Sequence, residues 1–245
     1  MFIVQEADYL AHVGIMGMKW HHHKIGNTIQ TKTANIEKWG TDKDHNILYI
    51  TGYSGSGKST LAVTLKDKNT NVIHLDPYFE KMDKNVSASI KDKEFTKFLD
   101  KNFPEYQTIA NHKDGERHTK PWWNKVDKLM KQTEKFAEQQ YPKKKVIVEG
   151  VQLSDNTAYG NNSFYKGKPL AITETGAIKS YLRASKRDDK SIIKSIKGAK
   201  EYIQWYGNMT ESISKLSEVT NTKKGNDWVD KYLASKGGMQ INETK

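Results

Sequence analysis

The stretch NILYITGYSGSGKSTLAV, residues 46–63, decides the fold class of this chain. Its first letters, NILYIT, form a short apolar run that ends at a glycine, which predicts a buried β-strand. The letters GKSTLAVTLKD further along predict a helix. Between strand and helix lies the pattern G-x-x-x-x-G-K-[ST], a glycine-rich loop whose backbone amides can surround phosphate groups. Residues 52–60 are therefore predicted to hold the phosphates of a nucleotide.

The residue types in this loop match the chemistry of a nucleotide bound together with magnesium. Glycines let the backbone curl so that successive amides point inward, and the positive end of the following helix also attracts phosphate. The ammonium group of Lys58 is expected to reach the β- and γ-phosphates, and the hydroxyl of Ser59 to bind Mg²⁺. ATP and Mg²⁺ are thus the expected cofactors. The residues predicted to bind them in this loop are Gly52, Tyr53, Ser54, Gly55, Ser56, Gly57, Lys58, Ser59 and Thr60.

Three further short apolar runs predict strands at residues 71–76, 143–150 and 168–175, with helical patterns between them. Buried strands that alternate with helices indicate a parallel sheet covered on both faces. The expected fold is therefore α/β, a three-layer P-loop NTPase fold with helices on both faces of a parallel sheet. A polar, mainly helical region at about 80–141 is interpreted as an insert that carries the substrate.

Two acidic residues end predicted strands, at the edge where open parallel sheets bind ligands. Glu149 closes the third strand and is well placed to hold Mg²⁺ directly or through water; the alternative is an ordinary polar residue at a strand exit. Asp76 closes the second strand, just before Pro77. It is predicted to accept the proton of an acceptor hydroxyl or to orient that hydroxyl. The alternative for Asp76 is an aspartate that starts a turn.

Arginine is scarce in this chain, because only three of its 40 basic residues are arginines. The guanidinium group matches phosphate oxygens better than an ammonium group does, so each arginine is a candidate phosphate contact. Arg183 and Arg187 lie one helical turn apart and are predicted to be catalytic; a surface salt-bridged pair is the alternative. Arg117 precedes Trp122 and Trp123, an arrangement that suits stacking on a base of the substrate, although packing of the two tryptophans explains it equally well.

The net charge of +11 favours a nucleic-acid partner, but the excess is almost entirely lysine, which a low-GC coding bias also explains. The absence of cysteine excludes disulfides and thiolate metal sites. No apolar run is long enough to cross a bilayer, and the first residues lack the features of a secretory signal. A cytoplasmic protein without a membrane partner is expected.

Taken in order, these segments resemble the P-loop kinases of the nucleoside and nucleotide kinase group. The segments that carry the resemblance are GYSGSGKST, HLDPYF, VIVEGVQL and ITETGAIKSYLRASKRDD, within about residues 45–205. VIVEG is similar to uridine kinases, and HLDPYF to uridine, polynucleotide and zeta-toxin kinases. The resemblance implies that Lys58 and Ser59 bind ATP and magnesium, that Asp76 meets the acceptor, and that a lid at about 176–200 closes Arg183 and Arg187 over the phosphates.

The expected division is an appendage at residues 1–44 and a kinase domain at 45–245. Within the appendage, HVGIMGMKW at residues 12–20 resembles a short peptide at the ends of some head proteins of Gram-positive phages. That resemblance implies a phage origin, a targeting role for this segment and association with the virion. Three consecutive histidines at 21–23 are interpreted as a solvated basic run. Residues 124–127 match the N-K-x-D guanine motif of GTPases, which should follow a core strand. Here the match opens a predicted helix, so it is interpreted as chance.

The function expected from these residues is transfer of the γ-phosphoryl group of ATP to a hydroxyl of a nucleoside or nucleotide. A 5′-hydroxyl polynucleotide kinase is the first alternative, favoured by the positive charge and the tryptophan pair, and a zeta-toxin-like kinase is another. A phage structural or packaging protein that binds ATP without phosphorylating anything is the alternative from a different class. The insert matches none of the kinase subfamilies, so the sequence does not name the acceptor.

Overall fold

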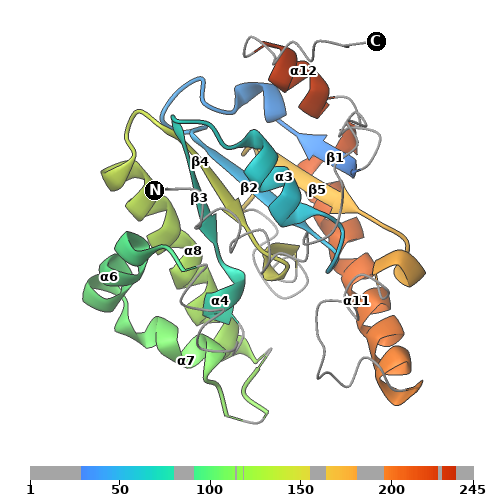
Figure 1. Cartoon of the computed structure of the whole chain (residues 1–245). Coiled ribbons are helices and arrows are strands. Elements are labelled where there is room, and N and C mark those ends of the chain that lie inside the picture. Colours follow the sequence, from blue (N-terminus) through green and yellow to red (C-terminus); the bar gives the residue numbers. More distant parts are fainter. Residues whose placement is uncertain are drawn as a thin grey trace, which may run out of the picture.

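Six strands form one sheet in the computed structural model, which describes residues 29–79, 91–113, 115–117, 119–154, 164–180, 196–225 and 228–235. The strands are β1 (Gln30–Ala34), β2 (Ile47–Gly52), β3 (Thr70–His74), β4 (Lys145–Glu149), β5 (Leu170–Glu174) and β6 (Lys223–Lys224). Their order in the sheet is β3-β4-β2-β5-β1-β6 (Figure 1). Neighbours among β3, β4, β2 and β5 pair in parallel, whereas β1 is antiparallel to β5 and to β6. The expected α/β class is confirmed, but the sheet is mostly rather than wholly parallel, because β1 and β6 add antiparallel pairs.

Helices follow the strands and fill the region between β3 and β4. The α-helices are α3 (Lys58–Leu65), α4 (Asp76–Phe79), α6 (Lys93–Asn102), α7 (Gln107–Ala110), α8 (Lys120–Gln140), α11 (Ile196–Thr220) and α12 (Trp228–Ser235), and the 3₁₀ helices are η1 (Ile36–Lys38) and η2 (Pro104–Tyr106). The side chain of Asp92 caps α6 by accepting from the amide of Phe95, and Pro121 lies in the first turn of α8, where its missing N–H costs nothing. None of the helices in these described segments has the length and apolar character of a membrane span.

Alternating side chains of the strands divide the core into two layers, one on each face of the sheet. On one face Leu48, Ile50 and Ile147 pack with α3 and α12. On the other face Tyr49, Val146 and Val148 pack with α6, α8 and α11. Figure 1 shows α3 and α8 on the two sides of the strands. Because both faces are covered by the apolar sides of amphipathic helices, the central strands are buried along their length, and only their ends reach solvent.

The segment before the phosphate loop is part of the sheet. β1 pairs with β5 from Gln30, opposite Glu174, to Ala34, opposite Leu170. Trp39 is buried and donates from Nε1 to the carbonyl of Asn46 at 3.2 Å. The boundary expected between residues 44 and 45 is therefore not observed, and the sheet domain includes residues 29–44. The sequence QTKTA of β1 has little apolar character, and only two of its residues, Thr31 and Ala34, are buried, on opposite faces of the sheet.

Candidate functional site

The loop between β2 and α3 is curled and closely packed. Gly52 has a φ of 139° and Gly57 a φ of 102°, values that residues with a side chain rarely adopt. A Cβ atom on Gly52 would lie 2.1 Å from the carbonyl oxygen of Thr173, so β5 leaves no room for one. Ser56 is buried and hydrogen-bonds Thr173 at 2.5 Å between the two hydroxyl oxygens. The glycine-rich pattern thus folds into a compact loop fixed against β5.

Lys58 is the first residue of α3, and only 7% of it is exposed. Its Nζ donates to the carbonyl of Tyr53 at 3.2 Å, so the ammonium group lies against the backbone of the loop. Within the described segments no carboxylate forms an ion pair with it. A buried cation whose hydrogen bond within the described segments goes to a neutral carbonyl attracts an anion that enters the site.

Ser59 and Glu149, predicted separately as magnesium ligands, are brought together by the sheet. β4 lies beside β2, and Glu149 is its last residue. The hydroxyl of Ser59 donates to Oε1 of Glu149 at 3.3 Å. The other carboxylate oxygen, Oε2, is buried and accepts no hydrogen bond from any described residue. A hydroxyl beside a carboxylate with a spare oxygen fits Mg²⁺, which takes few protein ligands together with phosphate oxygens and waters. The described residues contain no cluster of three or more metal-binding His, Asp or Glu side chains, which such a site does not need.

His74, which the sequence analysis did not single out, is the closest partner of Glu149. It ends β3 directly opposite Glu149 in the parallel register, and its Nδ1 lies 2.5 Å from Oε1 of Glu149. Burial alone would raise the pKa of Glu149, but the hydrogen bond and charge of His74, with the charge of Lys58, lower it below its usual value. The carboxylate is therefore held in its charged form. Only the register of β3 against β4 shows this contact, and the sequence does not give that register.

Asp76 lies one strand further from the loop, at the start of α4 and half-buried. Its Oδ1 accepts from the backbone amide of Val151 at 2.8 Å, and the amide of Leu75 donates to the carbonyl of Glu149 at 2.9 Å. The chain segments that follow β3 and β4 are thus bonded to each other. Asp76 and Glu149 are both held at the carboxyl edge of the sheet, as the strand pattern predicted.

Helix α11 and the short helical segment at residues 177–180 contact the loop between β2 and α3. The ring of Tyr53 stacks on Tyr206, with centroids 4.2 Å apart and planes 14° from parallel. The hydroxyl of Tyr53 donates to Oγ1 of Thr210 at 3.1 Å. Ser180 donates to the carbonyl of Ser54. The sequence pattern gave no indication of these contacts, because they join residues more than a hundred positions apart.

Of the remaining predicted site residues, the structure describes Trp122 and Trp123 at the start of α8 and Arg117 just before it. Trp122 and Trp123 are 2% and 5% exposed in the core at the start of α8, as the packing alternative requires, and Trp122 donates to the carbonyl of Ile109 at 3.0 Å. Arg117 is partly buried in the loop before α8. Arg183 and Arg187 lie outside the described residues, as does most of the expected lid.

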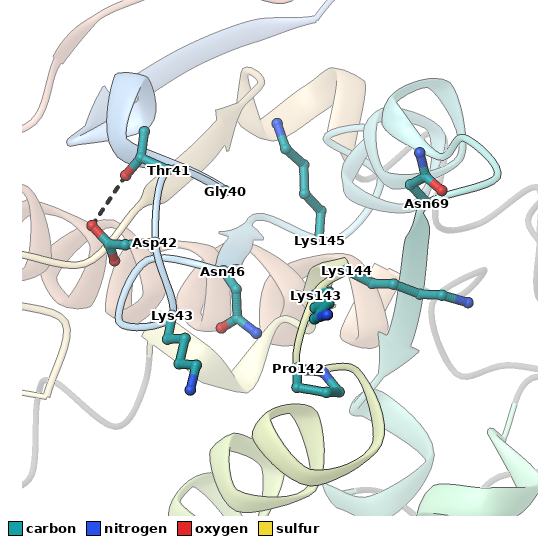
Figure 2. A pocket seen from close by; sticks show the side chains of 10 residues that line it. All are labelled: Gly40, Thr41, Asp42, Lys43, Asn46, Asn69, Pro142, Lys143, Lys144 and Lys145. Atoms are coloured by element: carbon teal, nitrogen blue, oxygen red, sulfur yellow. Dashed lines mark hydrogen bonds between the residues drawn. The ribbon is translucent and has the colours of Figure 1, made fainter.

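A groove of about 480 Å³ lies at the opposite, amino end of the parallel strands (Figure 2). Its lining includes the loop before β2, Asn69 just before β3, and residues 142–145 where β4 begins. The side chains of Lys43, Lys144 and Lys145 point in different directions in Figure 2. They do not converge on one point, so the groove lacks the geometry of a site for a single phosphate. None of the predicted site residues lines it.

No protein-family model matches this chain, and no curated protein sequence is significantly similar to it. The functional interpretation therefore depends on the geometry around Lys58, Ser59, Glu149 and Asp76.

Proposed function

We propose that this chain is an ATP-dependent kinase with a P-loop NTPase fold, which transfers the γ-phosphoryl group of ATP to a hydroxyl of a nucleoside or nucleotide. One observation carries the proposal. A curled phosphate loop with a buried lysine and a hydroxyl–carboxylate pair lies at the same sheet edge as a second carboxylate, Asp76. A protein that only binds ATP has no need for the second acid.

In this proposal the two acids have different roles. Ser59 and Glu149 would hold Mg²⁺, which neutralises charge on the β- and γ-phosphates. Support for this role comes from the bond between Ser59 and Glu149 and from Oε2 of Glu149, which accepts no hydrogen bond within the described segments. Lys58 would bind the phosphates themselves, because its ammonium group lies against the loop and is paired with no described carboxylate.

Asp76 would act on the acceptor. As the acceptor oxygen bonds to the γ-phosphorus, the bond from that phosphorus to the β–γ bridging oxygen breaks, ADP leaves, and the hydroxyl proton passes to Asp76. Oδ1 of Asp76 accepts from the amide of Val151, which fixes the carboxylate at this edge of the sheet. Such a positioned base contributes about a hundredfold or more to the rate. Arg183 and Arg187 would stabilise charge on the group in transfer, as the family resemblance implies.

The acceptor class is proposed from the family resemblance, and a labelled-phosphate screen tests it. The protein is incubated with γ-labelled ATP, Mg²⁺ and, separately, nucleosides, nucleotides, sugars and 5′-hydroxyl oligonucleotides, with the Lys58→Ala variant as control. Label on a nucleoside or nucleotide is the expected result. Label on an oligonucleotide alone would favour the polynucleotide kinase, and release of inorganic phosphate without any labelled acceptor would favour an ATP-binding structural or packaging protein.

A further inference from the structure

The contacts of Glu149 are unevenly divided between its two carboxylate oxygens. Oε1 accepts from the hydroxyl of Ser59 at 3.3 Å and from Nδ1 of His74 at 2.5 Å. Oε2 accepts nothing from the described residues, although it is buried. A buried charged oxygen without a partner is costly, because it has lost its water and gained no hydrogen bond. Something in the functional state is therefore expected to contact Oε2.

His74 is built into the sheet in a way that fixes its ring. It is the last residue of β3, pairs in register with Glu149, and is 8% exposed. The terminal torsion of a glutamate side chain is soft, so an unrestrained carboxylate would rotate between orientations. The short bond from the His74 ring removes that freedom. Oε1 of Glu149 is then bonded within the protein, and Oε2 can bind a ligand.

We infer that His74 is a positioning residue for the metal site: by donating from Nδ1 to Oε1 of Glu149, it orients the carboxylate so that Oε2 meets Mg²⁺ or a water bound to it. This inference rests on the proposed function, in which Ser59 and Glu149 hold the metal. Partners that orient a metal ligand from behind typically change metal affinity about 10- to 100-fold when removed. His74 contacts neither ATP nor the acceptor in this account.

A purely structural buried pair is the competing explanation. It predicts that loss of His74 lowers stability without a specific effect on metal binding. The backbone pairing of β3 with β4 extends from Thr70, opposite Lys145, to His74, opposite Glu149, and does not depend on the His74 side chain. The two explanations are therefore separable by measuring metal affinity and thermal stability on the same variants.

Two substitutions of His74 and one control form the experiment. In His74→Asn the side-chain amide nitrogen takes the place of Nδ1 and still donates, whereas His74→Leu is similar in size and cannot donate. His45→Leu is the matched control, because His45 makes an exposed Nδ1 contact of 2.8 Å with Asp42 at the other end of the sheet. The probe is Mn²⁺, which accepts the same oxygen ligands as Mg²⁺, titrated into the full-length protein with ADP and followed by electron paramagnetic resonance.

The expected result is that His74→Leu weakens Mn²⁺ binding to the ADP-bound protein about 10- to 100-fold, while His74→Asn and His45→Leu bind it like the wild type. ADP binding in EDTA should be the same for all four proteins, which shows that the phosphate loop is intact. Wild-type Mn²⁺ affinity in a folded His74→Leu protein would overturn the inference. Equal losses in His74→Asn and His74→Leu would also overturn it, because packing rather than the hydrogen bond would then matter. If the wild type itself bound no Mn²⁺ with ADP, the proposed function would fail as well.

Discussion

The two ends of the parallel sheet carry similar charged side chains but organise them in opposite ways. At the carboxyl end, Ser59, Glu149 and His74 form a short chain of hydrogen bonds, and the two titratable groups in it are buried. At the amino end, Lys143 and Lys144 are exposed and form no ion pair with any described residue. Electrostatic interactions are far stronger in the first environment than in the second, which water and salt screen. Burial of the bonded groups, rather than the number of charges, marks the candidate site.

The largest effect is expected from removing β1, the strand that connects the two ends. β1 begins beside the carboxyl end of β5, and the chain after it reaches the groove at Gly40. A chain that starts at Asp42 loses this strand and the buried Trp39, whose side chain alone is worth about 3–5 kcal/mol. Since whole domains are stable by only about 5–15 kcal/mol, cooperative unfolding should be lost.

Thermal melts followed by circular dichroism check this prediction, with a chain that starts at Thr28 as the control that keeps every described residue. A sharp transition at the wild-type temperature in the shorter chain would mean that β1 is dispensable. That outcome would restore the appendage boundary near residue 44.

A matched pair of lysine substitutions compares the two ends directly. Lys58→Ala should lower phosphoryl transfer by about 10²- to 10³-fold, the usual cost of removing one group that stabilises charge in the transition state. Lys143→Ala makes the same chemical change at the amino end and should leave transfer at the wild-type rate. The labelled-phosphate assay measures both, with melts to show that both variants fold. Equal activity of the two variants would remove the distinction between the ends.

A smaller effect is expected from removing the negative charge of Asp76, one of the two acids at the carboxyl end. Asp76→Asn keeps an oxygen for the amide of Val151 but loses the negative charge, so kcat should fall about a hundredfold while ATP binding is nearly unchanged. Single-turnover transfer and calorimetric titration with ATP provide the two readings. If Asp76→Asn transferred phosphate normally and Glu149→Gln did not, the roles given to the two acids would be wrong.

The smallest effect is expected from reversing charge in the groove. The double variant Lys143→Glu, Lys144→Glu should change stability by less than about 0.5 kcal/mol, because both side chains are exposed and unpaired within the described segments. Transfer to a nucleoside should stay within about twofold of the wild type, since charges beyond a Debye length of about 8 Å are screened. A large loss of phosphoryl transfer with an oligonucleotide acceptor alone would instead indicate that nucleic acid binds at the amino end of the strands.

The sequence was informative where the candidate site depends on neighbours along the chain. The glycine-rich loop is a local pattern, and the positions of Glu149 and Asp76 at the sheet edge could be predicted because each follows a short apolar strand. His74 and β1 could not be found in this way. The contact of His74 with Glu149 depends on the register between β3 and β4, and β1 is a short polar strand whose partner lies more than a hundred residues away. Pairing between distant segments is the information that a single sequence does not show.

The position of β1 also has a consequence for the order of events in folding. β1 is synthesised before every other strand described, yet it lies between β5 and β6, which are the last two described strands to be made. Contacts between such distant segments form slowly, because a long loop must close before any pairing is gained. Ile29, next to β1, packs close to Gly57 of the phosphate loop. Insertion of the first strand and final packing of the phosphate loop are therefore expected to occur together, as one late step.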